Sequence, residues 1–476
     1  MLKVLMVTSE ASPYAKTGGL ADVLGSLPGA LQKNDADVRV IMPKYGSIPG
    51  KRKESIVQIA YIYVDLGWRH LYCGIEQSEF NGVTYYFIDN EFYFNRDNLY
   101  GYGDDCERFA FFNKAVIEAI PYLCYQPDII HCHDWQSGML PVLLDTGYKE
   151  QELYRDIKTI FTIHNLRYQG ICGIDQMKEW FGLKDSYFTE DKLEFYQSAN
   201  FMKGGLVYSD FITTVSDTYA QEIKSCFYGE KMDGLLNARS AQLFGIVNGI
   251  DYEEFNPQTD PFLYQNYTKS GLSGKALNKT ALQKDLNLTE REDIPMIGLI
   301  SRLVDQKGLD LIECVFHEMM EEEVQFVILG TGTEKYEKLF ADAVTRYPGK
   351  ISANIRFDNG LAHKIYAASD FFLMPSLFEP CGLGQLISLR YGTLPIVRET
   401  GGLKDTVISY NEATGEGNGF SFMNYNAHDM LFTIKRALEI YKKKTLRTKL
   451  QKAAMSCDYS WQNSAGKYIE LYKRLK

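Results

Sequence analysis

The sequence predicts an α/β protein with two Rossmann-like, doubly wound domains that face a cleft. The chain opens with an apolar strand at residues 2–7, a glycine loop at residues 17–19 and a helical pattern over residues 24–31, which is the unit that begins a parallel α/β sheet. The string Thr17-Gly18-Gly19-Leu20 returns in the other half of the chain as Thr400-Gly401-Gly402-Leu403. With 476 residues the chain is long enough for two such domains, and the repeated loop suggests one ligand held between them.

The first predicted domain spans residues 1–247. Apolar strand-like runs alternate with helical patterns, which predicts a parallel sheet covered on both faces. After the first strand, strands are expected at residues 38–42, 128–131, 159–163, 211–215 and 244–247. Two segments rich in β-forming residues, 56–66 and 83–88, predict a hairpin inserted at the sheet edge.

The second predicted domain spans residues 248–456 and follows the string Val247-Asn248-Gly249-Ile250-Asp251. The same alternation begins again there. Strands are expected at residues 295–301, 324–329, 351–357, 371–374 and 394–397, and helices at 307–320, 334–346, 427–441 and 446–454. The last helix, residues 461–475, fits either domain by its pattern alone.

The composition disfavours several classes of partner. A net charge of −10 and a pI of about 5.4 make nucleic acid and anionic membranes poor partners. No apolar run is long enough for a membrane span, and the N-terminus lacks the pattern of an export signal. The 9 cysteines are irregularly spaced, as expected for reduced thiols. The expected compartment is the cytoplasm.

Three cations are candidates for binding a phosphate. Arg302 and Lys307 follow a buried strand where a helix begins, a position that suits a phosphate or pyrophosphate. Lys16, in the first glycine loop, would add a third positive charge. Ordinary surface ion pairing is the alternative for each residue alone. The presence of two glycine loops favours the phosphate site.

The common phosphate and metal motifs are absent. The Lys16 loop lacks the earlier glycine of a Walker loop, and Gly330-Thr331-Gly332 is followed by Lys335 where a dinucleotide fingerprint has its third glycine. The string His131-Cys132-His133-Asp134 has no second ligand cluster at zinc spacing, so no metal site is expected. Without a metal, arginine and lysine would have to stabilise a leaving diphosphate.

Two further polar groups follow predicted strands, at the edge where α/β sheets bind ligands. The pair His164-Asn165 suits a sugar hydroxyl, although an isolated histidine is more often a core residue. Glu379 lies in the loop Phe378-Glu379-Pro380-Cys381-Gly382-Leu383-Gly384. Its carboxylate can bind sugar hydroxyls or balance positive charge at an anomeric carbon, and it is also a favourable residue for a helix start.

Taken together, these strings resemble those of the bacterial glycogen synthase and plant starch synthase family. The strings that carry the resemblance are Lys16 to Val23, His131 to Trp135, Thr162 to Asn165, Val247 to Asp251, Ser301 to Leu303, Phe378 to Leu383 and Thr400 to Leu403. Each is weak alone. In this order they cover nearly the whole chain and are highly specific.

The resemblance implies a GT-B fold, with an acceptor-side first domain that residues 457–476 rejoin and a second domain on the nucleotide-sugar side. It implies transfer of glucose from ADP-glucose to the non-reducing end of an α-1,4-glucan, with retention at the anomeric carbon and without a metal or other cofactor. The implied partners are ADP-glucose and a glycogen, α-1,4-glucan or maltooligosaccharide acceptor.

The resemblance also implies roles for individual residues. The implied catalytic residues are Arg302 and Lys307 on the diphosphate, Glu379 and His164 against the donor glucose, and Asp134. The implied substrate-binding residues are Lys16, Gly18, Gly19, Asp22, Asn165, Asn248, Phe357, Cys381, Gly382, Leu383 and Thr400. Of these, Phe357 stands where the family stacks a tyrosine on adenine.

The chain departs from related retaining transferases at one informative position. Those enzymes carry a second acid eight residues after the first, where this chain has Ile387. We therefore expect same-face substitution within an ion pair, without a covalent glucosyl-enzyme.

Three alternatives remain open on the sequence. A sucrose- or trehalose-type GT-B enzyme would share Arg302, Lys307 and Glu379 but would be less expected to keep the Lys16 loop. A dinucleotide-dependent oxidoreductase is disfavoured by the missing third glycine. A catalytically idle glucan-binding protein would not need the three cations.

Overall fold

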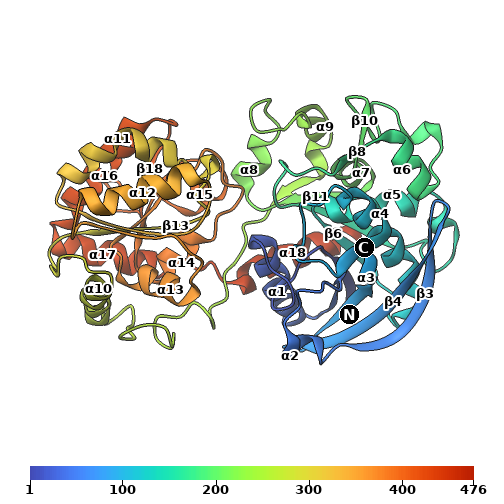
Figure 1. Ribbon diagram of the computed structural model, residues 1–476, viewed down its shortest axis with the longest axis horizontal. Coiled ribbons are helices and arrows are strands. Elements are labelled where there is room, and N and C mark those ends of the chain that lie inside the picture. Colours follow the sequence, from blue (N-terminus) through green and yellow to red (C-terminus); the bar gives the residue numbers. More distant parts are fainter. The chain divides into compact units, whose positions relative to one another are not determined.

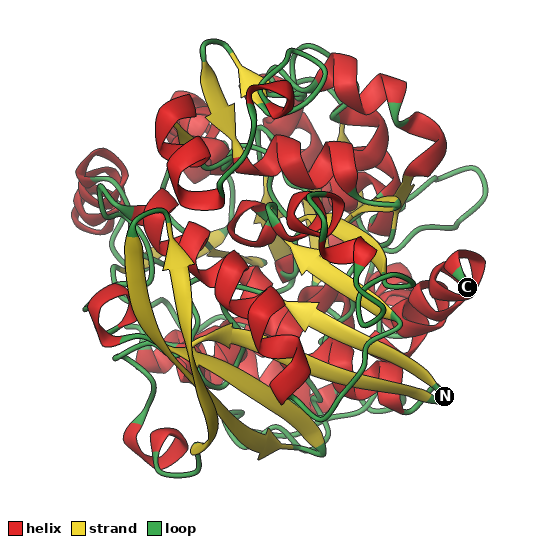
Figure 2. Ribbon diagram, turned by 90° about the vertical axis from the view of Figure 1, so that its right-hand side faces the viewer, coloured by secondary structure: helices red, strands yellow, loops and turns green.

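The computed structural model describes residues 1–476 and divides the chain into two compact units (Figure 1). The first unit contains Met1–Gly249 and Trp461–Lys476, and the second contains Ile250–Ser460. These boundaries lie within a few residues of the predicted ones, although Asn248 belongs to the first unit rather than the second. Both chain termini lie in the first unit (Figures 1 and 2).

The first unit contains a nine-stranded sheet in the order β12-β11-β7-β6-β1-β2-β5-β4-β3. Its strands are β1 Leu2–Val7, β2 Ala36–Pro43, β3 Val57–Leu66, β4 Arg69–Phe80, β5 Val83–Asp89, β6 Ile129–His133, β7 Lys158–Ile163, β11 Phe211–Thr214 and β12 Leu243–Gly245. The strands from β12 to β5 are parallel, and β4 and β3 complete the edge in antiparallel fashion. A small second sheet contains β8 Ile171–Cys172, β9 Glu194–Phe195 and β10 Ser198–Asn200.

The prediction that residues 56–66 and 83–88 pair with each other as a hairpin is wrong. Strand β4, which the sequence analysis did not identify, lies between the two segments and pairs with both. Its sequence is rich in residues with weak strand preference, including Gly74 and Glu79, so propensity alone does not indicate a strand. The predicted strand 83–88 instead joins the parallel sheet through β2.

Helices of the first unit cover its parallel sheet. They are α1 Gly19–Gln32, α2 Gly50–Lys53, α3 Glu91–Phe94, α4 Asp105–Ala119, α5 Leu140–Asp145, α6 Ile174–Phe181, α7 Phe201–Tyr208, α8 Asp217–Glu222, α9 Asp233–Ala238 and α18 Trp461–Leu475. The last helix, α18, buries Tyr468, Leu471 and Tyr472 in the core of this unit. The Tyr472 hydroxyl forms a 2.8 Å hydrogen bond with Nδ1 of His131 on β6.

The second unit is a six-stranded parallel sheet in the order β15-β14-β13-β16-β17-β18. Its strands are β13 Met296–Ile300, β14 Gln325–Leu329, β15 Ile351–Asn354, β16 Phe371–Met374, β17 Leu394–Arg398 and β18 Phe420–Phe422. Renumbered from its first strand, this is the 3-2-1-4-5-6 order of a Rossmann fold. Its helices are α10 Ser273–Asp285, α11 Leu309–Glu321, α12 Glu334–Arg346, α13 Asn359–Ala368, α14 Gly384–Arg390, α15 Gly401–Thr406, α16 Ala427–Tyr441 and α17 Lys444–Ala454.

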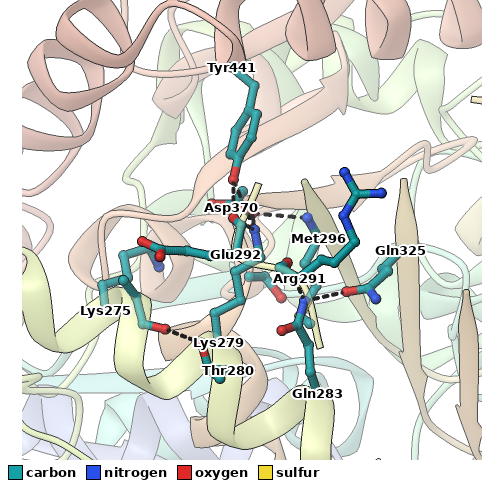
Figure 3. Close-up of polar contacts among 12 residues, drawn as sticks. Lys275, Lys279, Thr280, Gln283, Arg291, Glu292, Met296, Gln325, Asp370 and Tyr441 are labelled. Carbon is teal, nitrogen blue, oxygen red and sulfur yellow. Dashed lines mark hydrogen bonds and ion pairs between the residues drawn. The ribbon is translucent and has the colours of Figure 1, made fainter. Parts of the chain in front are cut away.

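Helix α10 is attached to the second unit by buried polar contacts (Figure 3). Lys279 Nζ lies 2.7 Å from the Asp370 carboxylate and donates to the Tyr441 hydroxyl at 2.9 Å. Gln283 donates to Gln325 Oε1 at 2.7 Å. Because the Lys279 ammonium is paired with Asp370, the helix packs on the sheet without leaving an uncompensated charge, although Gln283 Oε1 is buried without a partner.

No helix in the structure is both long enough and apolar enough to cross a bilayer.

Candidate active site

The candidate residues of the second unit lie at the switch point of its sheet. Strands β13 and β16 are neighbours, and the connections after them run to opposite sides. Crevices of this kind, at the carboxyl ends of the strands, are where open α/β sheets bind ligands. Arg302 and Lys307 follow β13, and the Phe378–Leu383 loop follows β16. The sheet order therefore brings together two segments that are far apart in the sequence.

Lys307 and Glu379 form the central contact of this switch point. Lys307 Nζ lies 2.7 Å from Glu379 Oε2, which also accepts from the Ser376 hydroxyl at 3.0 Å. Both paired side chains are largely buried. Glu379 Oε1 makes no hydrogen bond within the unit. A lysine ammonium carries three donors, so Lys307 can hold Glu379 and still donate to a ligand oxygen.

Arg302 lies five residues before Lys307 in the same segment after β13 and is exposed. Its guanidinium makes no ion pair or hydrogen bond within the unit. The loop that carries it is fixed by neighbouring backbone contacts, since Leu303 N–H donates to Thr331 at 2.8 Å and Leu303 accepts from Thr333 at 2.8 Å. A fixed loop with an unpaired cation at a switch point is suited to an anionic ligand.

The second glycine string packs directly on the Glu379 loop. A Cβ on Gly402 would lie 2.1 Å from the Cys381 carbonyl oxygen, and a Cβ on Gly401 would lie 2.0 Å from the Glu379 carbonyl oxygen. Gly402 N–H also donates to the Glu379 carbonyl at 3.2 Å. These glycines therefore hold the loop in place through close backbone packing. The string Gly330-Thr331-Gly332 has a similar role, since a Cβ on Gly332 would lie 2.1 Å from the Leu303 carbonyl oxygen.

The remaining candidates of this unit lie around the same loop or near it. Gly382 has a φ of +75°, a conformation that favours glycine, and Leu383 precedes α14. Cys381 and Thr400 are buried. Phe357, after β15, is 86% exposed, so its ring is available to a flat ligand. Ile387 is buried in α14, so no carboxylate stands at that position.

The candidate residues of the first unit lie at its own switch point, between β1 and β6. The Lys16 loop follows β1, Asp134 follows β6 and His164 follows β7. Lys16 Nζ lies 2.5 Å from Asp22 Oδ1, and both side chains are partly exposed. A Cβ on Gly18 would meet no atom closer than 3.9 Å, so this glycine leaves open space rather than filling a close contact.

Glu10 supports the Lys16 loop and is a residue that the sequence analysis did not identify. Its Oε2 accepts from the Thr17 amide at 2.6 Å and from the Thr17 hydroxyl at 2.9 Å. Burial raises the pKa of this carboxyl above its ordinary value. Its position in the polar turn after β1 is the only sequence signal for this role.

Asp134 fixes the backbone of His164 and Asn165. Its Oδ1 accepts from the His164 amide at 2.7 Å and from the Asn165 amide at 3.3 Å. Its φ of +57° is a strained conformation for a residue other than glycine. Burial raises the pKa of Asp134 to about 7 and lowers that of His164 to about 3. The His164 imidazole is therefore neutral near pH 7.

His133 contacts the predicted catalytic histidine, a role that was not assigned to it from the sequence. Its Nδ1 forms a 2.9 Å hydrogen bond with His164 Nε2. Its own Nε2 is buried without a partner. Burial holds the pKa of His133 well below its ordinary value, so one neutral ring donates and the other accepts. The contact fixes the orientation of the His164 ring.

A pocket of about 540 Å³ lies beside the Lys16 loop. Its lining includes Tyr14, Lys16, Thr17, Ser47, Asn98 and Tyr100. The lining combines aromatic rings with hydroxyl and amide groups and with the charged side chains of Lys16 and Asp97, a mixture that suits a sugar chain. The segment around Asn98 had no recognisable motif, so the sequence alone did not indicate it.

The structure thus assembles each set of candidates within its own unit. In the second unit Lys307 contacts Glu379, and in the first unit Asp134 contacts the amides of His164 and Asn165. Asn248 is buried near the end of the first unit. No group of three or more histidine, cysteine, aspartate or glutamate side chains is placed to hold a metal ion.

The raised pKa of Asp134 gives a testable dependence of stability on pH. The folded protein retains this proton up to about pH 7, whereas the unfolded carboxyl loses it near its ordinary value of 3.8. The contribution of Asp134 to stability is therefore complete below pH 4 and is lost as the pH rises to 7. Asp134→Asn, whose amide oxygen can still accept from His164, is expected to remove this contribution.

The measurement is the urea midpoint of wild type and Asp134→Asn between pH 4 and pH 8. The wild-type midpoint is expected to fall more steeply with rising pH than that of the variant. Parallel curves would show that Asp134 ionises at the same pH in both states.

Two Rossmann-like units, each with polar residues at its switch point, define a glycosyltransferase of the GT-B class. The starch synthase catalytic domain family matches residues 3–238, and the glycosyl transferases group 1 family matches residues 282–456. A glycogen synthase of Lachnospira eligens is 55% identical over 478 residues, which cover 100% of both chains. A glycogen synthase of Geobacillus thermodenitrificans is 53% identical over 474 residues, covering 100% of this chain and 98% of the relative.

A solved structure agrees with these relatives. The catalytic domain of starch synthase IV from Arabidopsis thaliana, bound to ADP and acarbose, has a TM-score of 0.93 and 35% identity, covering 100% of this chain and 99% of that one. A sucrose-phosphate synthase from Thermosynechococcus elongatus, at 17% identity and a TM-score of 0.62, shares the fold alone. The chain belongs to the glycogen and starch synthase family.

Proposed function

We propose that this protein transfers glucose from ADP-glucose to the non-reducing end of an α-1,4-glucan, with retention of the anomeric configuration and without a metal or other cofactor. The observation that carries the proposal is the Lys307–Glu379 contact of 2.7 Å at the switch point of the second unit, on the segment after β13 that also carries the exposed Arg302. The relatives named as glycogen synthases, and the plant relative bound to ADP, support the choice of donor and acceptor.

In this proposal the cations of the second unit bind the leaving diphosphate. Arg302 offers a planar set of donors to the phosphate oxygens, and Lys307 adds a positive charge. Negative charge develops on the diphosphate as its bond to the glucose breaks, so these fixed charges stabilise the transition state more than the bound donor. Lys307 remains hydrogen-bonded to Glu379, whose free Oε1 accepts from a donor hydroxyl.

The first unit positions the glucose in this proposal. Asp134 accepts from the His164 amide and also from the Asn165 amide at 3.3 Å. Because the Asn165 amide shares a peptide plane with the His164 carbonyl, this second contact fixes the direction in which the carbonyl points. That carbonyl lies against the anomeric carbon and stabilises its developing positive charge. The acceptor hydroxyl attacks from the face that the diphosphate leaves, and its proton passes to the departing phosphate oxygen. Retention of the anomeric configuration then needs no second carboxylate. This agrees with the presence of Ile387 at the position where related retaining transferases carry a second acid.

In this proposal Lys16, Gly18 and Gly19 also bind the donor nucleotide sugar, and the salt bridge of Lys16 with Asp22 opens when the donor binds. The pocket beside Lys16 would receive the end of the acceptor chain.

The test is incubation of the purified protein with glycogen and glucose-labelled ADP-glucose or UDP-glucose. Label from ADP-glucose is expected in the polymer and should be released as maltose by an exo-acting amylase specific for α-1,4 bonds. Absence of incorporation, or label that resists this digestion, would contradict the proposed reaction. Preferential use of UDP-glucose would contradict the proposed donor alone.

A further inference from the structure

We propose that the outer face of the β3–β4 ribbon is a second α-glucan-binding site, separate from the candidate active site. The inference rests on the proposed function for the choice of ligand. The ribbon forms the edge of the nine-stranded sheet, where β3 pairs only with β4 (Figure 1). Three tyrosines on it, Tyr61, Tyr63 and Tyr72, are 61%, 52% and 40% exposed.

The strand register places the three rings on one face. Tyr63 lies opposite Tyr72 in the antiparallel pair, and Tyr61 lies opposite Gly74. Residues opposite one another, or two apart on one strand, share a face. The alternate residue Val64 and the cross-strand Cys73 are buried on the other side. The tyrosines are therefore held outward by the packing of their neighbours.

The rings form one cluster rather than three isolated side chains. The ring centres of Tyr61, Tyr63 and Tyr72 are 6.3 to 6.5 Å apart, and Tyr61 and Tyr72 are nearly parallel, at 24°. His70 stacks on Tyr63 with a centre distance of 4.7 Å and an angle of 8°. The Tyr72 hydroxyl lies 2.8 Å from where a Gly74 Cβ would be, so the glycine makes room for this arrangement.

Side-chain contacts with helices α4 and α6 hold the ribbon that carries the cluster in place. At its turn, Arg69 donates to Glu179 of α6 at 3.1 Å. Lys114 of α4 donates to the Asp65 carbonyl on β3. Rings that already contact one another on a fixed strand lose little conformational freedom when a ligand binds, which is the advantage of tyrosine in recognition surfaces.

The chemistry of this face suits a neutral sugar polymer. Tyrosine rings present flat apolar surfaces to the C–H faces of pyranose units, and their hydroxyls exchange hydrogen bonds with sugar hydroxyls. The polar groups around them are the Gln58 amide, which lies 3.5 Å from the Tyr72 hydroxyl, and Asp65 and His70, which pair at 2.6 Å. Since Asp65 and His70 partner each other, the face carries no unpaired cation for an anionic ligand.

A second protein chain is less suited to this face of the ribbon than a glucan is. An aromatic side chain has about 150–250 Å² of surface that binding can bury. With the exposed fractions given above, the three tyrosines together offer a ligand roughly 300 Å² of accessible surface. A stable protein interface needs about 800 Å² from each partner. Edge-to-edge pairing through β3 is also opposed by the break in register between Gln58 and Ala60. A few sugar units, in contrast, would be covered by a patch of this size.

The test compares wild type with Tyr61→Ala/Tyr63→Ala/Tyr72→Ala, and uses Tyr122→Ala, another exposed tyrosine of the first unit, as the matched control. Retardation in native gels that contain glycogen should be clearly weaker in the triple variant, which keeps only the active site for the polymer, and unchanged in the control. The KM for glycogen should rise on the order of tenfold, because a second contact raises the local concentration of the polymer. Turnover with maltotetraose, which is too short to reach both sites, should stay within about twofold.

Retardation of the triple variant equal to that of wild type would overturn the proposal. So would a wild-type dimer in light scattering that the triple variant loses without a change in retardation, because the face would then bind a second copy. If the triple variant does not fold, Tyr61→Ser should give a smaller loss of retardation, and no loss would overturn the proposal. Gel retardation needs no catalysis, so it tests this face even if glucose transfer from ADP-glucose fails.

Discussion

Lys307→Ala is expected to lower kcat by about a hundredfold or more, with a much smaller change in the KM for ADP-glucose. The reason is that the ammonium acts on charge that appears only as the diphosphate leaves. Lys307→Gln should lose a similar factor, since an amide can still donate to Glu379 but carries no charge. The measurement is steady-state kinetics with glycogen as acceptor, together with thermal melting to confirm that the variants fold.

Lys335→Ala is the matched control for this prediction. Lys335 Nζ lies 2.7 Å from the Glu313 carboxylate, the same distance as in the Lys307–Glu379 pair. Unlike that pair, the side chains of Lys335 and Glu313 are both exposed. Exposed ion pairs contribute little, so kcat should stay within about twofold of wild type. An unchanged kcat with a raised KM for Lys307→Ala would show that Lys307 only binds the donor.

Gly402→Ala is expected to reduce kcat by about a hundredfold, although Gly402 itself need not touch the substrate. The new methyl group would lie 2.1 Å from the Cys381 carbonyl oxygen, which is backbone and cannot rotate away. The loop must therefore shift, and it carries Glu379 and the Cys381 to Leu383 amides. A displacement of about 1 Å in a positioning group is enough for a loss of this size.

The control for Gly402→Ala is Gly466→Ala, in the middle of α18. A Cβ there would meet no atom within 4 Å, so alanine should leave kcat unchanged and raise the melting temperature slightly, because it suits a helix better than glycine. Wild-type kcat in Gly402→Ala would show that the glycine packing does not position Glu379.

Much of the fold could be predicted because the buried strands are short apolar runs. Residues 2–7, 371–374 and 394–397 were predicted from this pattern, and the structure has β1 at Leu2–Val7, β16 at Phe371–Met374 and β17 at Leu394–Arg398. Strand β4 was missed because its preference for a strand comes from packing between β3 and β5, which the local sequence does not contain. Helix α10 was not predicted because its inward face includes Lys275 and Lys279, whose partners lie about a hundred residues away in the chain.

The sequence indicated which residues belong to the candidate site, but it did not indicate which of them contact one another. Arg302, Lys307 and Glu379 stood out because each follows a buried strand, yet nothing local shows that Lys307 and Glu379 meet, since 72 residues separate them. The reading of the second glycine string as a ligand loop was incomplete, because Gly401 and Gly402 pack on the Glu379 loop itself. Glu10 and His133 were missed because their roles depend on a turn and on a neighbouring strand.

The central claim is that cations fixed in the second unit perform the work that a divalent ion performs in other transferases. The most direct test is the initial rate of glucose transfer from ADP-glucose to glycogen after exhaustive dialysis against EDTA, with EDTA kept in the assay. The rate is expected to equal that measured with added Mg²⁺. A rate that falls to background and returns on addition of Mg²⁺ or Mn²⁺ would contradict it.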